Sequence, residues 1–152
     1  MDNNTKDKLL FEMSKIDKLL EKTLPLFNTP TNDVEEYSRI IIASSLLHSF
    51  YNGVESFAVI LFKSIGEMSH NDTQWHKKLL EKIFGDNQKG IILIRKELKD
   101  TMVNHMKFRH FYRHTYDQDL EWYEIEPLLE NLQDIWSKIK EDFTSFINKH
   151  YE

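Results

Sequence analysis

Turn-forming residues are scarce in this chain, and their scarcity limits the folds open to it. Only 4 glycines and 3 prolines occur among 152 residues, too few for the many tight turns of a strand-rich sandwich. Apolar residues recur every three or four positions over long stretches, which is the spacing of amphipathic helices. The sequence therefore predicts an all-α fold: an antiparallel up-and-down bundle of four long helices and one short helix in a single domain, residues 1–152.

The apolar spacing places three helices in the first half of the chain. A helix is expected over residues 5–23, ended by Pro25, and a long one over residues 33–68. A short helix is then expected from a cap at Asp72 or Thr73 to Gly85, because glycine commonly follows the last helical residue.

The second half is expected to contain two further long helices. The apolar pattern predicts one over residues 91–114, and this helix has a basic C-terminal end. Residues 116–126 are expected to be irregular, and Pro127 suits the first position of the last helix.

Composition excludes several classes of protein. The chain has no cysteine, so disulfide scaffolds, thiol nucleophiles and cysteine-bound metals are excluded. A net charge of -5 argues against a surface that binds nucleic acid over its whole extent, although a local basic site is compatible with it. The N-terminus has no signal-peptide pattern and polar residues interrupt the most apolar stretch, residues 40–65. We therefore expect a cytoplasmic protein without a membrane span.

The residues richest in chemistry lie together at 105–116. On a helix, Arg109 and Arg113 share one face, because four residues turn about 400°. His110 and His114 share another face for the same reason. Arg109 and His114 are separated by about 140° and converge only if the helix distorts or a second subunit contributes. This spacing favours a site formed by a dimer.

Two other interpretations of this segment remain. Lys, Arg and His at a helix C-terminus complement the helix dipole, so the cluster can be a solvated basic end. His110 and His114 have the spacing of two metal ligands, but the glutamate that a metalloprotease helix carries between them is missing. No metal and no cofactor are expected.

A polar stripe interrupts the apolar second helix. His48, Asn52 and Glu55 are spaced to lie on one side of it. Buried polar residues of this kind are usually hydrogen-bonded within the bundle. Alternatively, the stripe orients the helix of residues 91–114, with Glu55 pairing with Arg109.

The segment Arg109-His-Phe-Tyr-Arg-His114-Thr-Tyr116 resembles a known motif. Its order of Arg, four residues, His, any residue and Tyr is similar to the signature of HEPN-domain ribonuclease toxins. The resemblance is closest to the HepT-like partners of minimal nucleotidyltransferase antitoxins. Segments 47–55, Trp75-His76 and 108–114 also look like a HepT-like group.

The resemblance implies a metal-independent endoribonuclease toxin of a type VII-like toxin–antitoxin module. It implies a homodimer, or a dimer of dimers, in which two motifs face each other, and RNA as substrate. Arg109 and His114 would carry the reaction, and the antitoxin would attach AMP to Tyr116. His110, Arg113 and Lys107 are candidates for binding RNA. The alternative from another class is a catalytically silent helical module that binds a nucleotide or a protein.

Overall fold

The computed structural model describes residues 2–28, 33–68, 75–114 and 119–151. The expected all-α bundle is confirmed: these residues form six α-helices and two short 3-10 helices, and they contain no β-strand beyond one isolated bridge between Phe84 and Ile92. The elements are α1 (Asn3–Thr23), η1 (Leu24–Phe27), α2 (Asp33–Ser64), α3 (Trp75–Ile83), η2 (Lys96–Leu98), α4 (Lys99–Arg113), α5 (Trp122–Leu129) and α6 (Leu132–His150).

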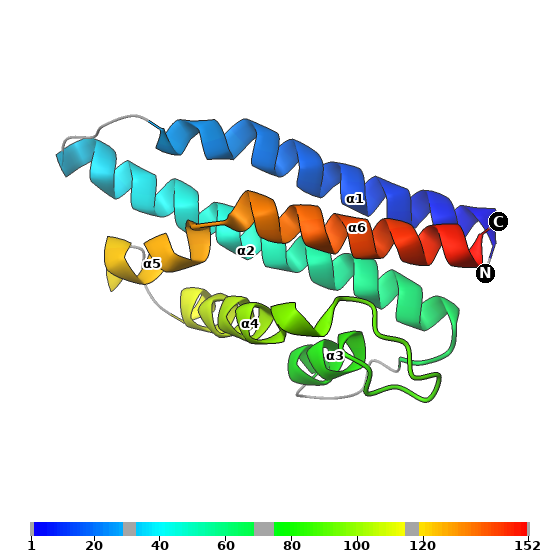
Figure 1. Cartoon of the computed structure of the whole chain (residues 1–152). Helices are drawn as coiled ribbons and strands as arrows, with labels where there is room; N and C mark the ends of the chain where they lie inside the picture. Colours follow the sequence, from blue (N-terminus) through cyan, green and yellow to red (C-terminus); the bar gives the residue numbers. More distant parts are fainter. Residues whose placement is uncertain (1, 29–32, 69–74, 115–118, 152) are drawn as a thin grey trace.

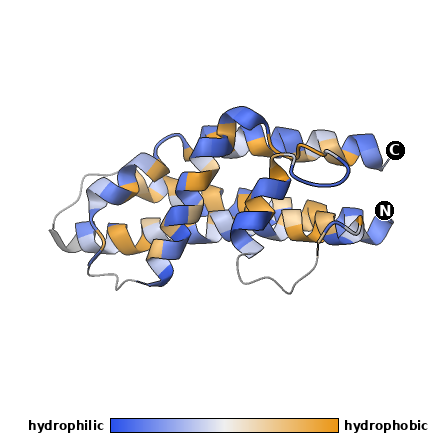
Figure 2. Ribbon diagram, turned by 90° about the horizontal axis from the view of Figure 1, so that it is seen from below, coloured by the Kyte–Doolittle hydropathy of each residue, from blue (hydrophilic) through white to orange (hydrophobic). Residues whose placement is uncertain are grey.

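The four long helices α1, α2, α4 and α6 alternate in direction along the chain (Figure 1). The long α2 is the centre of the arrangement, because α1, α3, α4 and α5 all pack against it. The two chain ends lie close together at one end of the bundle, and the C-terminal end of α4 lies toward the opposite end (Figure 1). Hydrophobic and hydrophilic bands alternate along the helices, as expected for amphipathic helices with one buried side (Figure 2).

Aromatic side chains join α6 to α2 in the core. The rings of Phe57 and Phe143 stack with centroids 3.7 Å apart, and Phe50 meets Trp136 edge-on at 6.3 Å. The indole nitrogen of Trp136 donates a 2.8 Å hydrogen bond to Asp17. The core therefore holds α1 and α6 against the buried side of α2.

The predicted end of the second helix was wrong by four residues. Helix α2 ends at Ser64 rather than at residue 68. Gly66 adopts a left-handed conformation (φ 73°), and the amide of Glu67 donates to the carbonyl of Phe62 at 2.8 Å. This bond closes the helix end in the way that glycine permits. The short helix ends at Ile83, just before Gly85; its predicted caps, Asp72 and Thr73, lie outside the described residues.

The helix predicted over residues 91–114 was wrong in its first eight residues. Residues 91–95 are not helical, and α4 begins only at Lys99, after η2. The backbone amide and guanidinium of Arg95 both bind Asp142 of α6, with N···O distances of 2.9 Å in each case. These bonds take Arg95 out of the helical pattern, so a tertiary contact overrides the apolar period.

The predicted start of the last helix was also wrong. Pro127 lies inside α5 rather than at the first position of α6, and the segment from Trp122, expected to be irregular, is helical. Asn131 has a left-handed conformation (φ 63°) and separates α5 from α6. Asparagine adopts this conformation more readily than most residues, so it permits the sharp turn. None of the described helices is both long and apolar enough to cross a membrane.

Candidate functional site

Helix α4 directs Arg109 toward the bundle. Its buried face consists of Met102, His105 and Phe108, and Arg109 follows Phe108 at the edge of that face. The Arg109 side chain is 14% exposed. The guanidinium therefore lies at the border between the packed interior and solvent.

Asn52 of α2 binds Arg109 from across the helix interface. The Nε–H of Arg109 donates a 2.8 Å hydrogen bond to Oδ1 of Asn52. The amide nitrogen of Asn52 then faces Nε2 of His48 at 3.0 Å. Because the amide can only donate, Nε2 of His48 is the acceptor and the ring proton is on Nδ1.

The surroundings of His48 favour this neutral form. Burial lowers the pKa of His48, and the positive charges of Arg109 and Arg113 lower it further. The ring packs against that of Tyr112, with centroids 5.0 Å apart. A neutral His48 accepts from Asn52 and so fixes the orientation in which Asn52 accepts from Arg109.

Glu55 is a buried carboxylate of α2 that contacts one residue of α3 and one residue of α4. It is 4% exposed, and its Oε1 lies 3.7 Å from Nε of Arg109. Its Oε2 lies 2.8 Å from Nδ1 of His76 on α3. Burial raises the pKa of Glu55, while the hydrogen bond and charge of His76, followed by the charge of Arg109, act in the opposite direction. The pairing expected between Glu55 and Arg109 is present.

His76 is the residue of this cluster to which the sequence assigned no role, although Trp75-His76 is part of the HepT-like resemblance. It lies 21 residues after Glu55 in the chain and on a different helix, so no local spacing connects the two. The sequence contained only an indirect sign: a glutamate on an apolar helix, which requires a partner when it is buried.

His114 lies apart from this cluster. It caps the C-terminus of α4, where its amide donates to the carbonyl of Phe111, and its side chain is exposed. Its ring contacts that of His110, with centroids 4.6 Å apart, so the predicted shared face of these two histidines is confirmed. Arg109 instead contacts α2, and the described contacts of one chain do not bring Arg109 and His114 together.

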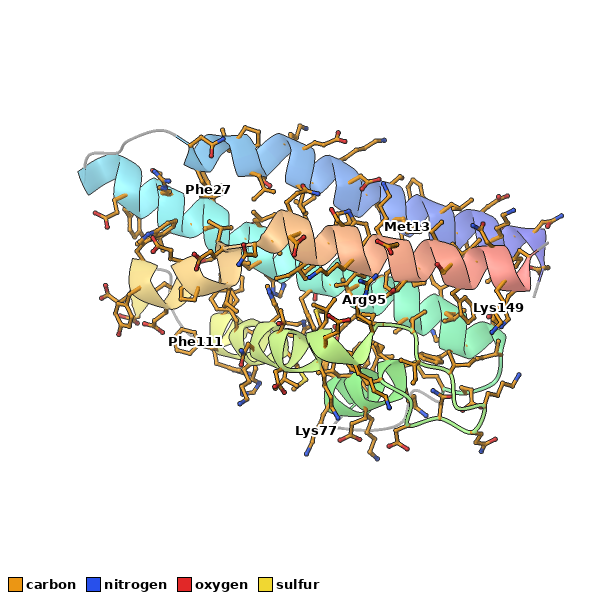
Figure 3. All side chains as sticks on the ribbon, viewed as in Figure 1. Met13, Phe27, Lys77, Arg95, Phe111 and Lys149 are labelled. Carbon is orange, nitrogen blue, oxygen red and sulfur yellow. The ribbon has the colours of Figure 1, made fainter. Side chains whose placement is uncertain are left out.

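The remaining predicted residues surround the end of α4. Arg113 is exposed and acts on His48 together with Arg109, which agrees with their predicted common face. Lys107 is exposed and lies about 200° around the helix from Arg109. Phe111 is on the outer side of α4 (Figure 3). Tyr116 lies outside the described residues.

Within the described ranges, no three His, Asp or Glu side chains gather as metal ligands would.

A model of the family described as HepT-like protein matches residues 42–150. The chain belongs to this family. The matched segment of this HepT-like protein contains every candidate residue on α2, α3 and α4, while α1 lies outside it. Neither the curated proteins nor the solved structures contain a significant match. Membership confirms the resemblance to the HepT-like family, and it connects the chain with the HEPN toxins of toxin–antitoxin modules.

Proposed function

We propose that this HepT-like protein is a metal-independent endoribonuclease and the toxin of a type VII-like HEPN/nucleotidyltransferase module. The observation that supports the proposal best is how Arg109 is held. Asn52 and Glu55 both engage its Nε, and neither Nη nitrogen has a hydrogen-bond partner among the described residues. The two Nη nitrogens, held in a fixed plane, thus remain available for a phosphate, which arginine binds in a bidentate manner.

The proposed reaction is attack of an RNA 2′-hydroxyl on the adjacent phosphorus. A base removes the 2′-hydroxyl proton, the 2′-oxygen–phosphorus bond forms, and the bond to the 5′-oxygen of the next nucleotide breaks. An acid gives that leaving oxygen a proton, and the upstream fragment ends in a cyclic phosphate. Arg109 stabilises the negative charge that develops on the phosphoryl oxygens. His114 is exposed, so RNA can reach it for proton transfer.

We propose a composite site formed by two copies, as a homodimer or a dimer of dimers. Arg109 and His114 contact different neighbours within one chain, so a site formed by two copies can combine Arg109 of one copy with His114 of the other. The experiment is to mix Arg109→Ala and His114→Ala proteins. If the sites are shared, a mixed dimer regains part of the cleavage that both homodimers lack.

Regulation is proposed to act at Tyr116. A cognate nucleotidyltransferase antitoxin would attach AMP to this tyrosine and place phosphate charge and bulk beside the basic end of α4. The positive surface that receives RNA would be extended by His110, Arg113 and Lys107. The protein would act in the cytoplasm. Incubation of the protein with the antitoxin and ATP, followed by intact mass and cleavage assays, is expected to show one AMP and lost activity. Tyr116→Phe is expected to remain unmodified and active.

The ribonuclease proposal itself is tested by cleavage of labelled total RNA in EDTA. Wild type is expected to cut, while Arg109→Ala and His114→Ala do not, although both fold. His150→Ala is the matched control, because this exposed histidine lies at the end of α6. If the unmodified wild type leaves RNA intact, the binding-module alternative takes the place of this proposal.

A further inference from the structure

One carboxylate connects His76 with Arg109. The two oxygens of Glu55 point to different partners: Oε2 to Nδ1 of His76 at 2.8 Å, and Oε1 to Nε of Arg109 at 3.7 Å. The three residues come from α3, α2 and α4. The carboxylate therefore has an orientation that His76 fixes on one side and Arg109 uses on the other.

We propose that His76 is a positioning residue for Arg109, acting through Glu55. By donating from Nδ1 to one oxygen of Glu55, His76 holds the other oxygen toward the guanidinium and keeps the group ionised there. This inference rests on the ribonuclease function proposed above, because it assigns a role in placing the phosphate-binding arginine.

The surroundings hold the His76 ring in place. The ring of Trp75 lies against it, with centroids 3.7 Å apart and an interplanar angle of 32°. Leu79, Leu80 and Ile83 anchor α3 in the core. The side chain of His76 is 26% exposed, whereas Lys77, the next residue, points away from the helices into solvent (Figure 3). The fold thus presents one histidine of α3 to the buried carboxylate.

The charge balance at Glu55 depends on three groups. His76 faces it from α3, Arg109 from α4 and Tyr51 from its own helix. Burial favours the protonated carboxyl, and His76 is the strongest of the opposing groups. Without His76, Glu55 takes up a proton at higher pH and no longer forms an ion pair with Arg109. The arginine then keeps only Asn52 as a fixed partner and gains rotational freedom.

Two substitutions of similar size separate this role from proton transfer by His76. His76→Asn retains an amide donor near the place of Nδ1 but cannot exchange a proton at neutral pH. His76→Met fills the space without a donor. We expect His76→Met to lower kcat about 10- to 100-fold, the scale of a misplaced catalytic group, and to move the acid limb of the kcat–pH profile to higher pH. His76→Asn is expected to recover most of the rate and the wild-type acid limb.

The same relationship is measurable without turnover. In a spectrum of the arginine Nε–H groups of 15N-labelled protein, the Arg109 signal is expected to shift in His76→Met and to stay near its wild-type position in His76→Asn. His150→Ala is expected to leave both the signal and the rate unchanged. If His76→Met does not fold, Glu55→Gln replaces it in the test, because it removes the charge that His76 orients. The same shift of the Arg109 signal and the same loss of kcat are then expected.

Two further results overturn the inference. An unchanged Arg109 signal in folded His76→Met shows that His76 does not position the arginine. Equal loss of kcat in His76→Asn and His76→Met, with the Arg109 signal retained in the asparagine variant, shows that His76 transfers protons instead. Lack of cleavage by wild type removes the ribonuclease proposal, and the spectra then still decide whether His76 positions Arg109.

Discussion

The Nε–H of Arg109 donates a 2.8 Å hydrogen bond to Oδ1 of Asn52, a residue 57 positions earlier in the chain. Together with Glu55, this bond fixes the guanidinium at Nε, while the two Nη nitrogens have no hydrogen-bond partner among the described residues. An arginine held in this way loses little further rotational freedom when it binds a phosphate, so its positive charge is preorganised for the reaction.

Removing the Asn52 acceptor is expected to weaken cleavage without unfolding the protein. In Asn52→Ala the guanidinium loses its shorter fixed contact, and kcat for RNA is expected to fall about 10- to 100-fold. Rates and far-UV circular dichroism of the same preparation test this. Ser56→Ala, an exposed change on α2, is the control. An Asn52→Ala rate equal to that of the control contradicts the assigned role.

His105 is expected to make the fold sensitive to acid. Burial lowers the pKa of His105 to about 4 from 6.5, and neither ring nitrogen has a hydrogen-bond partner in the part of the chain that the structure describes. A lowered histidine pKa means that the unfolded chain binds the proton more tightly than the folded one. The contribution of neutral His105 to the free energy of unfolding is therefore complete above pH 6.5 and is lost as the pH falls toward 4. The loss amounts to about 3 kcal/mol.

Urea unfolding of wild type and His105→Leu at several pH values measures this contribution. The wild type is expected to lose stability relative to the variant between about pH 6.5 and pH 4. Parallel stability curves over that interval contradict the prediction.

Glu55 is expected to show the opposite dependence. Burial raises its pKa above 4.5, so the folded protein binds the proton more tightly than the unfolded chain. The resulting stabilisation is present below pH 4.5 and is lost as the pH rises through the raised pKa. Glu55→Gln cannot ionise, and its free energy of unfolding relative to wild type is therefore expected to increase with pH over this range. A difference that decreases with pH counts against the assigned surroundings of Glu55.

The stacked pair Phe57 and Phe143 is expected to dominate the packing of α6 on α2. Both side chains are fully buried, and truncation of a buried phenylalanine typically costs about 3–5 kcal/mol. Phe143→Ala is expected to lower the free energy of unfolding by that amount in urea titrations. Phe11→Ala, which changes an aromatic residue that is 60% exposed, serves as the control and is expected to change it by less than about 1 kcal/mol.

Helical periodicity predicted most of the fold, because long amphipathic helices contain their signal in local spacing. It failed at residues 91–95, where Ile91 and Ile94 fit the helical period but the bonds between Arg95 and Asp142, 47 residues later, favour a non-helical segment. The same limit applies to the candidate site. Spacing placed Asn52 and Glu55 on one stripe and grouped His110 with His114. It could not find His76, since only the packing of α3 on α2 brings this residue to Glu55.

Cleavage of RNA by the protein in EDTA is the most direct test of the proposed function. Purified wild type, shown by mass to carry no AMP, is compared with folded His114→Ala and with His150→Ala on labelled total RNA. Fragments are expected with wild type and His150→Ala, and intact RNA is expected with His114→Ala. Intact RNA in all three, or equal cleavage by His114→Ala, contradicts it.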